Sequence, residues 1–204
     1  MVTMREAKQA AFAKFGIPDD GGDSEAWVEF KLGPLPMPFP NTDARRRAVT
    51  LHDLHHVLTG YRMDIIGEFE ISAWEIAAGC GSFAVPWLLN LMGTTAGLVS
   101  APLRTLRAFW RGARSRSLYT TLSHDEVIDQ PVDEVRRALG CAPLEERVAP
   151  RFEDVLQLGA AALAGLMLAL VLLAIILTPV TLVAWLWTYS SYRKDKARRA
   201  SNAT

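Results

Sequence analysis

Apolar and polar residues are distributed so that the chain divides into a mixed N-terminal part and an apolar C-terminal part. Residues 155–192 contain no Asp, Glu, Lys or Arg and are rich in Leu, Ala and Val. A helix crosses a bilayer with about 20 apolar residues. The stretch is therefore long enough for one transmembrane helix, or for a hairpin turning near Thr178-Pro179. The pattern predicts a helical domain over residues 1–154, a membrane segment over 155–192 and a basic tail over 193–204.

Helical periodicity and capping signals recur along the mixed part. Apolar residues stand at helical spacing in Arg5–Phe15, with Gly16 next. Thr42 and its neighbours offer N-cap side chains, Ser123-x-x-Glu126 is a capping box, and residues 131–139 end at a glycine. No stretch alternates with a period of two for long enough to predict a strand. The predicted fold class is all-α.

Two stretches depart from this pattern. Residues 34–40 carry Pro at every second position, which predicts an extended segment unpaired in any sheet, either crossing the domain surface or binding a partner's aromatic groove. Residues 76–103 carry no charge but several glycines, which favours two packed or membrane-grazing helices over one spanning helix.

The arginines at 104–116 indicate either a helix that lies against anionic lipid headgroups or the solvent-exposed face of a helix.

Charge and cysteine usage limit the class of protein. The formal net charge is zero, and the basic excess lies in the tail, so nucleic-acid binding is not expected. Cys80 and Cys141 form no C-x-x-C pair, as suits a reducing cytoplasm, and the first residues lack the apolar core of a secretory signal. The basic tail predicts a cytoplasmic C-terminus. With the arginines at 104–116, it favours a membrane protein with its metal-binding domain on the cytoplasmic face.

Candidate metal ligands are concentrated in one stretch. Three of the four histidines lie between residues 52 and 56. On a helix, His52, Asp53 and His56 can converge, because residues four apart share a face and the next residue is about 100° away. Glu68 opens the following apolar-periodic segment and can return a fourth ligand. Two imidazole nitrogens and two carboxylate oxygens suit a divalent metal, with Zn²⁺ the expected ion.

Three nearby or similar residues have less specific roles. Glu75 shares a helical face with Glu68, so it can either orient an imidazole N–H or bond to a neighbouring helix. Apart from the ligands themselves, it is the candidate catalytic group. His55 is expected to pack beside the ligands or support them. His124 has no second ligand nearby and is expected to be a surface histidine.

Two families of metalloenzymes fit this stretch poorly. Zincin proteases need H-E-x-x-H, and Asp53 replaces the glutamate. HD-type phosphohydrolases need a histidine ahead of the doublet, and none precedes His52. The run H-D-x-x-H, eleven residues, then Glu resembles the signature of the ubiquinone (coenzyme Q) biosynthesis protein four family. HVLTGY at 56–61, Gly67-Glu68 and PMPFPNT at 36–42 are also similar to that family.

The resemblance implies an all-helical metalloprotein, a homodimer or part of a biosynthetic complex, that acts at a membrane on a polyprenylated aromatic lipid. It implies either oxidative decarboxylation at ring carbon one, so that the protein would be a metal-dependent decarboxylase (a lyase), or a non-catalytic scaffold or lipid-binding role. The apolar segment and tail after residue 154 are not typical of the family. They keep open a membrane-tethered relative that acts on another isoprenoid lipid.

Overall fold

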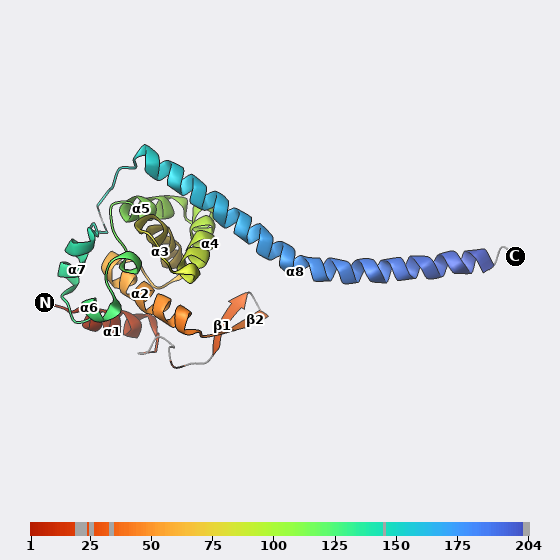
Figure 1. Ribbon diagram of the computed structural model, residues 1–204, viewed down its shortest axis with the longest axis horizontal. Helices are drawn as coiled ribbons and strands as arrows, with labels where there is room; N and C mark the ends of the chain where they lie inside the picture. The colour runs from red at the N-terminus through yellow and green to blue at the C-terminus, as the bar shows by residue number, and fades with distance from the viewer. Residues whose placement is uncertain (19–23, 25–26, 33–34, 145, 202–204) are drawn as a thin grey trace. The chain divides into compact units, whose positions relative to one another are not determined.

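The computed structural model describes residues 1–18, 24, 27–32, 35–144 and 146–201. The chain forms two compact units, Met1–Gly165 and Leu166–Thr204. The first unit is predominantly helical, as predicted (Figure 1). Its elements are α1 (Met4–Phe15), β1 (Trp27–Leu32), β2 (Leu35–Pro40), α2 (Asp43–Thr59), α3 (Ile65–Ala78), α4 (Ala84–Ser100), α5 (Pro102–Gly112), a 3₁₀ turn η1 (Leu118–Thr120), α6 (His124–Val127), α7 (Val132–Leu139) and the start of α8 (Phe152–Ser201).

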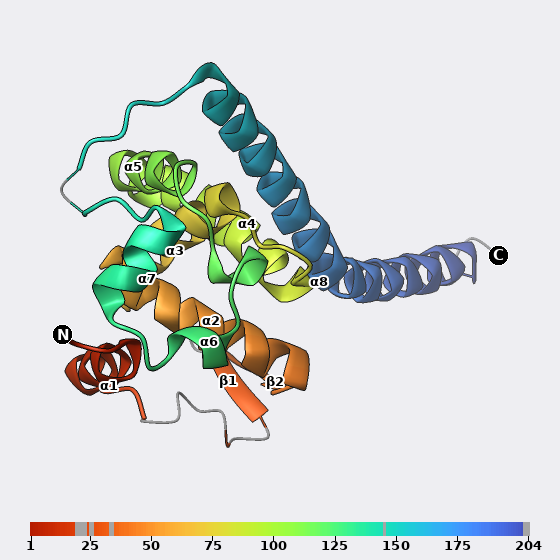
Figure 2. The same cartoon turned by 60° about the vertical axis from the view of Figure 1, so that its left-hand side comes forward.

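Helix α3 lies at the centre of the first unit and packs against α4 and α5 (Figure 2). Its side chains Ile71, Trp74 and Ile76 are almost fully buried. Close approach depends on small residues: a Cβ added at Gly93 would lie 2.3 Å from the Ser72 hydroxyl oxygen. The α3–α4 contact therefore tolerates no side chain at position 93 of α4.

The N-terminus is fixed against a distant part of the chain. The backbone N–H of Met4 donates to Gln130 O at 2.9 Å, and that of Arg5 donates to Ile128 O at 2.8 Å. In both ribbon views α1 lies beside α6 and α7 (Figures 1 and 2). The helix predicted over Arg5–Phe15, the capping box at Ser123 and the short helix ending at Gly140 are all confirmed.

The prediction that the proline-rich stretch stays unpaired is wrong. Strand β2 pairs with β1 in an antiparallel hairpin, with Met37 opposite Phe30 and Phe39 opposite Val28. Along a strand, successive N–H groups point to opposite edges. Prolines at every second position therefore all place their nitrogen on the same edge of the strand. In a two-stranded hairpin this can be the outer edge, where no backbone N–H donor is needed. The intervening residues of β2 can still pair with β1.

The predicted pair of helices in residues 76–103 is one helix, α4. The first residues of this stretch complete α3, and Gly79 ends it with a positive φ of 98°. Helix α4 packs against α3 and buries Asn90 and Thr94, while its apolar Leu88, Leu89 and Val99 are exposed.

The sequence left open a single helix or a hairpin turning near Thr178-Pro179 in the apolar segment, and the structure does not show the hairpin. Helix α8 continues through Pro179. The hydroxyls of Thr178 and Thr181 donate to carbonyls one turn earlier, Ala174 O at 2.6 Å and Leu177 O at 3.1 Å. A proline removes one backbone bond, and such side-chain bonds are common where an apolar helix continues past it. Among the described residues, one helix, Phe152–Ser190, is long and apolar enough to cross a membrane.

The first turns of α8 belong to the helical unit. Asp154 is almost fully buried and accepts two hydrogen bonds from the Arg114 guanidinium, at 3.0 and 2.5 Å. Gly165 lies so close to α4 that an added Cβ would be 2.3 Å from Leu91 O. The start of the apolar helix is thus held by an ion pair and by a close backbone contact.

Candidate metal centre

The turn between α2 and α3 brings the candidate ligands together. Gly60 ends α2 in the left-handed conformation (φ 76°), and Asp64 caps α3 by accepting from Gly67 N at 2.9 Å. Gly67 is required there because an added Cβ would lie 1.8 Å from Arg62 O. This tight turn places Glu68, in the first turn of α3, opposite the histidines of α2.

Three side chains converge: His52, His56 and Glu68 each offer one ligand atom, and these atoms lie within 4.8 Å of one another. The two Nε2 atoms are 3.2 Å apart. Glu68 places Oε2 3.2 Å from His52 Nε2 and Oε1 3.3 Å from His56 Nε2. The cluster therefore has the residue types and the spacing that a single divalent ion requires.

The other nitrogen of each ring fixes how the two histidines can act. His56 Nδ1 lies 3.1 Å from Tyr61 O, which can only accept, so this nitrogen carries the proton. His52 Nδ1 lies 2.9 Å from Oε1 of Glu75. With both Nδ1 atoms donating, the neutral rings present unprotonated Nε2 lone pairs to each other and to a carboxylate. Three such Lewis bases repel one another unless a proton or a metal ion lies among them.

Glu75 is the polar centre behind the ligands. Its side chain is fully buried, and Oε1 also lies 2.7 Å from His55 Nδ1. Its oxygens accept from Asn90 Nδ2 at 2.5 Å and from the Tyr119 hydroxyl at 3.3 and 3.4 Å. The sequence left open whether Glu75 contacts an imidazole or a neighbouring helix, and it contacts both.

The charges of the site are coupled. Burial alone would lower the pKa of His52, but Glu75 and Glu68 outweigh it and hold the pKa well above 6.5. Burial would raise the pKa of both glutamates. The histidines outweigh it, lowering the pKa of Glu68 to about 2 and that of Glu75 well below its usual range. Without a metal ion, the lone pairs are therefore separated by a proton on His52.

Exposure differs between the two sides of the cluster. The Glu68 side chain is 44% exposed and that of His52 22%, whereas Glu75 is fully buried. A metal held by His52, His56 and Glu68 would thus be supported from the protein side by Glu75 and reached from solvent beside Glu68. Such an arrangement is typical of catalytic rather than closed structural sites.

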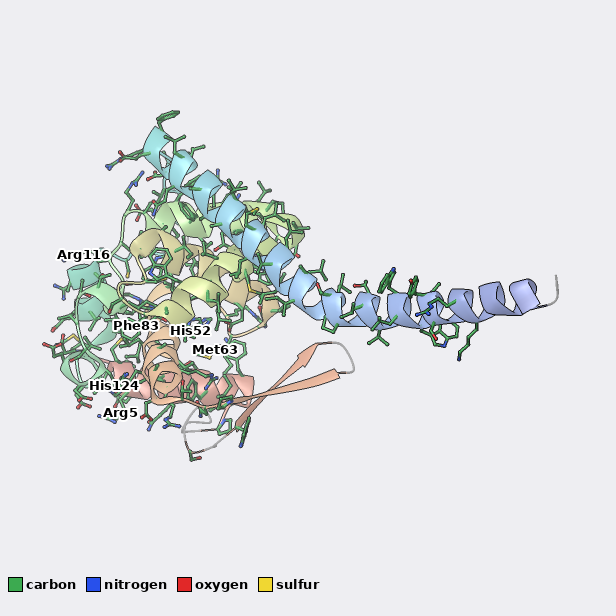
Figure 3. All side chains as sticks on the ribbon, turned by 45° about the vertical axis from the view of Figure 1, so that its right-hand side comes forward. Arg5, His52, Met63, Phe83, Arg116 and His124 are labelled. Carbon is green, nitrogen blue, oxygen red and sulfur yellow. The ribbon has the colours of Figure 1, made fainter. Side chains whose placement is uncertain are left out.

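Asp53, the fourth predicted ligand, is not part of this cluster. Its carboxylate forms an ion pair with Lys8 of α1 at 3.4 Å. Burial raises the pKa of Asp53, against the lowering effect of His52, Lys8 and His56. His124 lies in another part of the helical unit, 3.0 Å from its neighbour Asp125 (Figure 3).

Sequence reasoning missed the residues that hold Glu75 and His55. His55 is fully buried and accepts the backbone N–H of Leu118 at Nε2, 2.9 Å away. Tyr119, the residue after Leu118, donates its hydroxyl hydrogen bond to Glu75. The available signal was Asn90, an amide side chain in a helix without charged residues, since a buried amide needs a partner.

Comparisons of the chain with known protein families, with curated proteins and with solved structures found no match.

Proposed function

We propose that this protein binds one divalent metal ion through His52, His56 and Glu68 and acts on a lipid at a membrane. One observation carries the proposal: two Nε2 lone pairs and a carboxylate meet within hydrogen-bond distance of one another. The Nδ1 atoms are oriented by Tyr61 O and Glu75, as the outer partners of metal-bound histidines are.

Two histidines and one carboxylate suit two kinds of metal chemistry. This set occurs in catalytic zinc sites, where the ion polarises a bound oxygen. It also occurs in non-haem iron(II) oxygenases. Zn²⁺ is the simpler assignment for the charge and ligand types. An oxidative reaction requires the redox-active ion instead, because Zn²⁺ does not change its oxidation state.

The substrate class follows from the resemblance of the H-D-x-x-H…Glu stretch to the ubiquinone biosynthesis protein four family. We infer a polyprenylated aromatic acid, whose ring carboxyl group is replaced by a hydroxyl with loss of carbon dioxide. Molecular oxygen is the two-electron oxidant and leaves as hydrogen peroxide, and water supplies the hydroxyl oxygen. The apolar helix α8 would hold the protein in the membrane where such lipids reside. The exposed side of Glu68 would receive the ring carboxylate at the metal.

A separate cavity of about 630 Å³, which none of the three candidate ligands lines, suits an apolar ligand. Tyr119, which donates to Glu75, lines it together with the apolar Leu51, Phe83 and Leu122. Arg46 and Arg47 also contribute to its wall. The cavity has the volume typical of small-molecule sites.

Elemental analysis of the purified full-length protein tests the metal site. We expect about one metal ion per chain in the wild type and none in the His52→Ala/His56→Ala variant. Absence of metal from the wild type, after growth with zinc and iron supplied, would contradict the proposal. Glu134→Gln, on the exposed side of α7, is the control and should bind normally.

Substitution of Asp53 distinguishes a metal site with three ligands from one with four. If His52, His56 and Glu68 are the full ligand set, Asp53→Asn keeps the metal and Glu68→Gln loses most of it. If both variants lose equal amounts of metal, Asp53 leaves its ion pair with Lys8 and binds the metal ion.

Product formation separates an enzyme from a scaffold or lipid-binding protein. The reconstituted protein is incubated with a polyprenyl-hydroxybenzoate, and carbon dioxide release is followed from a labelled carboxyl group. Release that depends on Glu68 and on iron supports the decarboxylase. Bound metal and lipid without release support the non-catalytic alternative.

A further inference from the structure

Arg111 is a buried cation without an acidic partner among the described residues. It lies near the end of α5 and is 3% exposed. Its Nη2 donates to two backbone carbonyls, Thr59 O at 3.2 Å and Ala142 O at 2.6 Å. Its Nε and Nη1 have no hydrogen-bond partner within the part of the chain that the structure describes. A guanidinium is always charged, and buried charges are normally paired, so these free donors call for an acceptor.

The hydroxyl of Tyr61 is a second buried donor beside Arg111. The Arg111 guanidinium lies 4.9 Å from the centre of the Tyr61 ring, and the hydroxyl oxygen has no hydrogen-bond partner among the described residues. A phenol carries its proton at neutral pH, so the hydroxyl can donate. The free N–H groups of Arg111 and the O–H of Tyr61 are thus neighbouring buried donors, and among the described residues only the phenol oxygen itself could accept between them.

Both groups line one cavity of about 350 Å³. Three arginines of α5 contribute to it, at positions 104, 107 and 111, which share one helical face. Arg104 is paired with Glu70 through two bonds, at 2.9 and 2.6 Å. Arg62, also in the lining, is paired with Asp64. Arg107, which is exposed, and the buried Arg111 form no ion pair with a described residue.

We propose that this cavity, between α5 and the Gly60–Arg62 turn, is a binding site for a phosphate group, carried either by a small molecule or by a lipid headgroup. The donors of Arg111 and Tyr61 bind its oxygens from the buried side, and Arg107 binds from the exposed side. The site does not use the metal ligands, and its occupancy is measured independently of them.

Phosphate fits this donor set better than a neutral ligand does. Its ionised oxygens accept hydrogen bonds, the strongest of them from charged donors, and arginine provides several N–H groups in a fixed plane. Two cations and a phenol would match the charge of a phosphate monoester and three of its oxygens. The volume leaves room for a small group beyond the phosphate.

Isothermal titration of the full-length protein in a neutral detergent with inorganic phosphate tests the site. We expect saturable binding that weakens about tenfold in Arg107→Gln and in Tyr61→Phe, since each removes one hydrogen bond to a charged group. Tyr61→Phe keeps the ring against Arg111 and so preserves packing. Arg111→Met should abolish binding, with circular dichroism to check that the variant folds.

Arg137→Gln is the matched control. It removes an exposed arginine of α7 that does not line the cavity, and it should leave phosphate affinity unchanged. Absence of binding by the wild type, or equal binding by Tyr61→Phe, Arg107→Gln and the wild type, would overturn the proposal.

Two further experiments identify which group fills the cavity. Vesicles of phosphatidylcholine with added phosphatidic acid compete with inorganic phosphate only if a lipid headgroup enters the cavity. Either result of this experiment is compatible with a phosphate site.

Glu145 follows Leu144 of the lining and lies outside the described residues. If phosphate binds to Glu145→Gln but not to the wild type, the protein's own carboxylate fills the site, and the proposal fails.

Discussion

Glu75 is the residue on which the geometry of the candidate metal centre depends. It is fully buried and contacts both His52 and His55, but it does not belong to the group of converging ligand atoms. We expect Glu75→Gln to weaken metal binding by about 10–100-fold, because the amide no longer enforces an Nδ1 proton on His52. Competition with a fluorescent chelator measures the change. Unchanged affinity would show that the ring is held in another way.

The metal-free protein should be most stable at mildly acidic pH. His52 has a raised pKa, so its contribution is complete below 6.5 and is lost as the pH rises through the folded-state pKa. Glu68 has a lowered pKa, so its contribution is complete above 4.5 and is lost as the pH falls toward about 2. Urea denaturation midpoints at pH 3, 5.5 and 8.5 should therefore be highest at 5.5.

Glu68→Gln and added metal provide the controls for this pH profile. The variant should lose less stability on the alkaline side, because one of the two carboxylates that raise the pKa of His52 is gone. Bound metal should reverse the alkaline loss, since it replaces the His52 proton. A flat profile for the metal-free wild type would contradict the coupling.

At the scale of single residues, the sequence predicted the convergence of His52, His56 and Glu68 but not the other contacts around them. The spacing of His52, His56 and Glu68 follows from helix geometry and one turn, so it could be predicted. Asp53 is adjacent in sequence, yet it faces Lys8, a partner from α1 that helical spacing does not reveal. Asn90 and Tyr119 reach Glu75 only through packing between distant elements.

Among the elements, the turn between α2 and α3 has the strictest requirement. We expect Gly67→Ala to destabilise the protein by about 3 kcal/mol, because the new Cβ would meet the backbone of Arg62 rather than a movable side chain. It should also lower metal content by displacing Glu68. Gly159→Ala is the control: no atom of the described residues lies within 4 Å of the added Cβ, and helix propensity predicts a small gain. Equal effects of the two changes on thermal unfolding would contradict this account.

The start of α8 gives a second prediction at this scale. Asp154→Asn removes the charge of a buried carboxylate that holds Arg114, and it should cost about 2 kcal/mol and increase amide exchange in the first turn of α8. Glu153→Gln is the matched control, since Glu153 is exposed and its ion pair with Arg151 is 3.6 Å long. That change should cost less than about 0.5 kcal/mol. Similar exchange in both variants would contradict the prediction.

Element prediction failed where a local rule has a geometric exception. Proline usually excludes pairing, but alternate prolines leave one edge of β2 intact. Proline also suggested a turn within α8, but an apolar helix tolerates it when threonine hydroxyls bond to the preceding turn. The capped helices α1, α6 and α7 were predicted because their signals are local.

The whole molecule should associate with membranes through α8. We expect the full-length chain to float with vesicles and a chain ending at Gly165 to remain in the aqueous fraction with its helix content. Leu173→Arg/Leu177→Arg keeps the length but places charges within the apolar stretch, so it should also reduce flotation. Flotation of the shortened chain would place the membrane contact in the helical unit instead.

Tyr61 joins two parts of the molecule, because its backbone carbonyl accepts from His56 while its side chain lines the arginine cavity. Two ligands that meet at one residue are thermodynamically linked. If phosphate shifts Tyr61 and thereby changes metal affinity by some factor, metal must change phosphate affinity by the same factor. The protein would then respond to the product of two concentrations rather than to either alone, and its activity would be greatest where the ion and the phosphorylated ligand occur together.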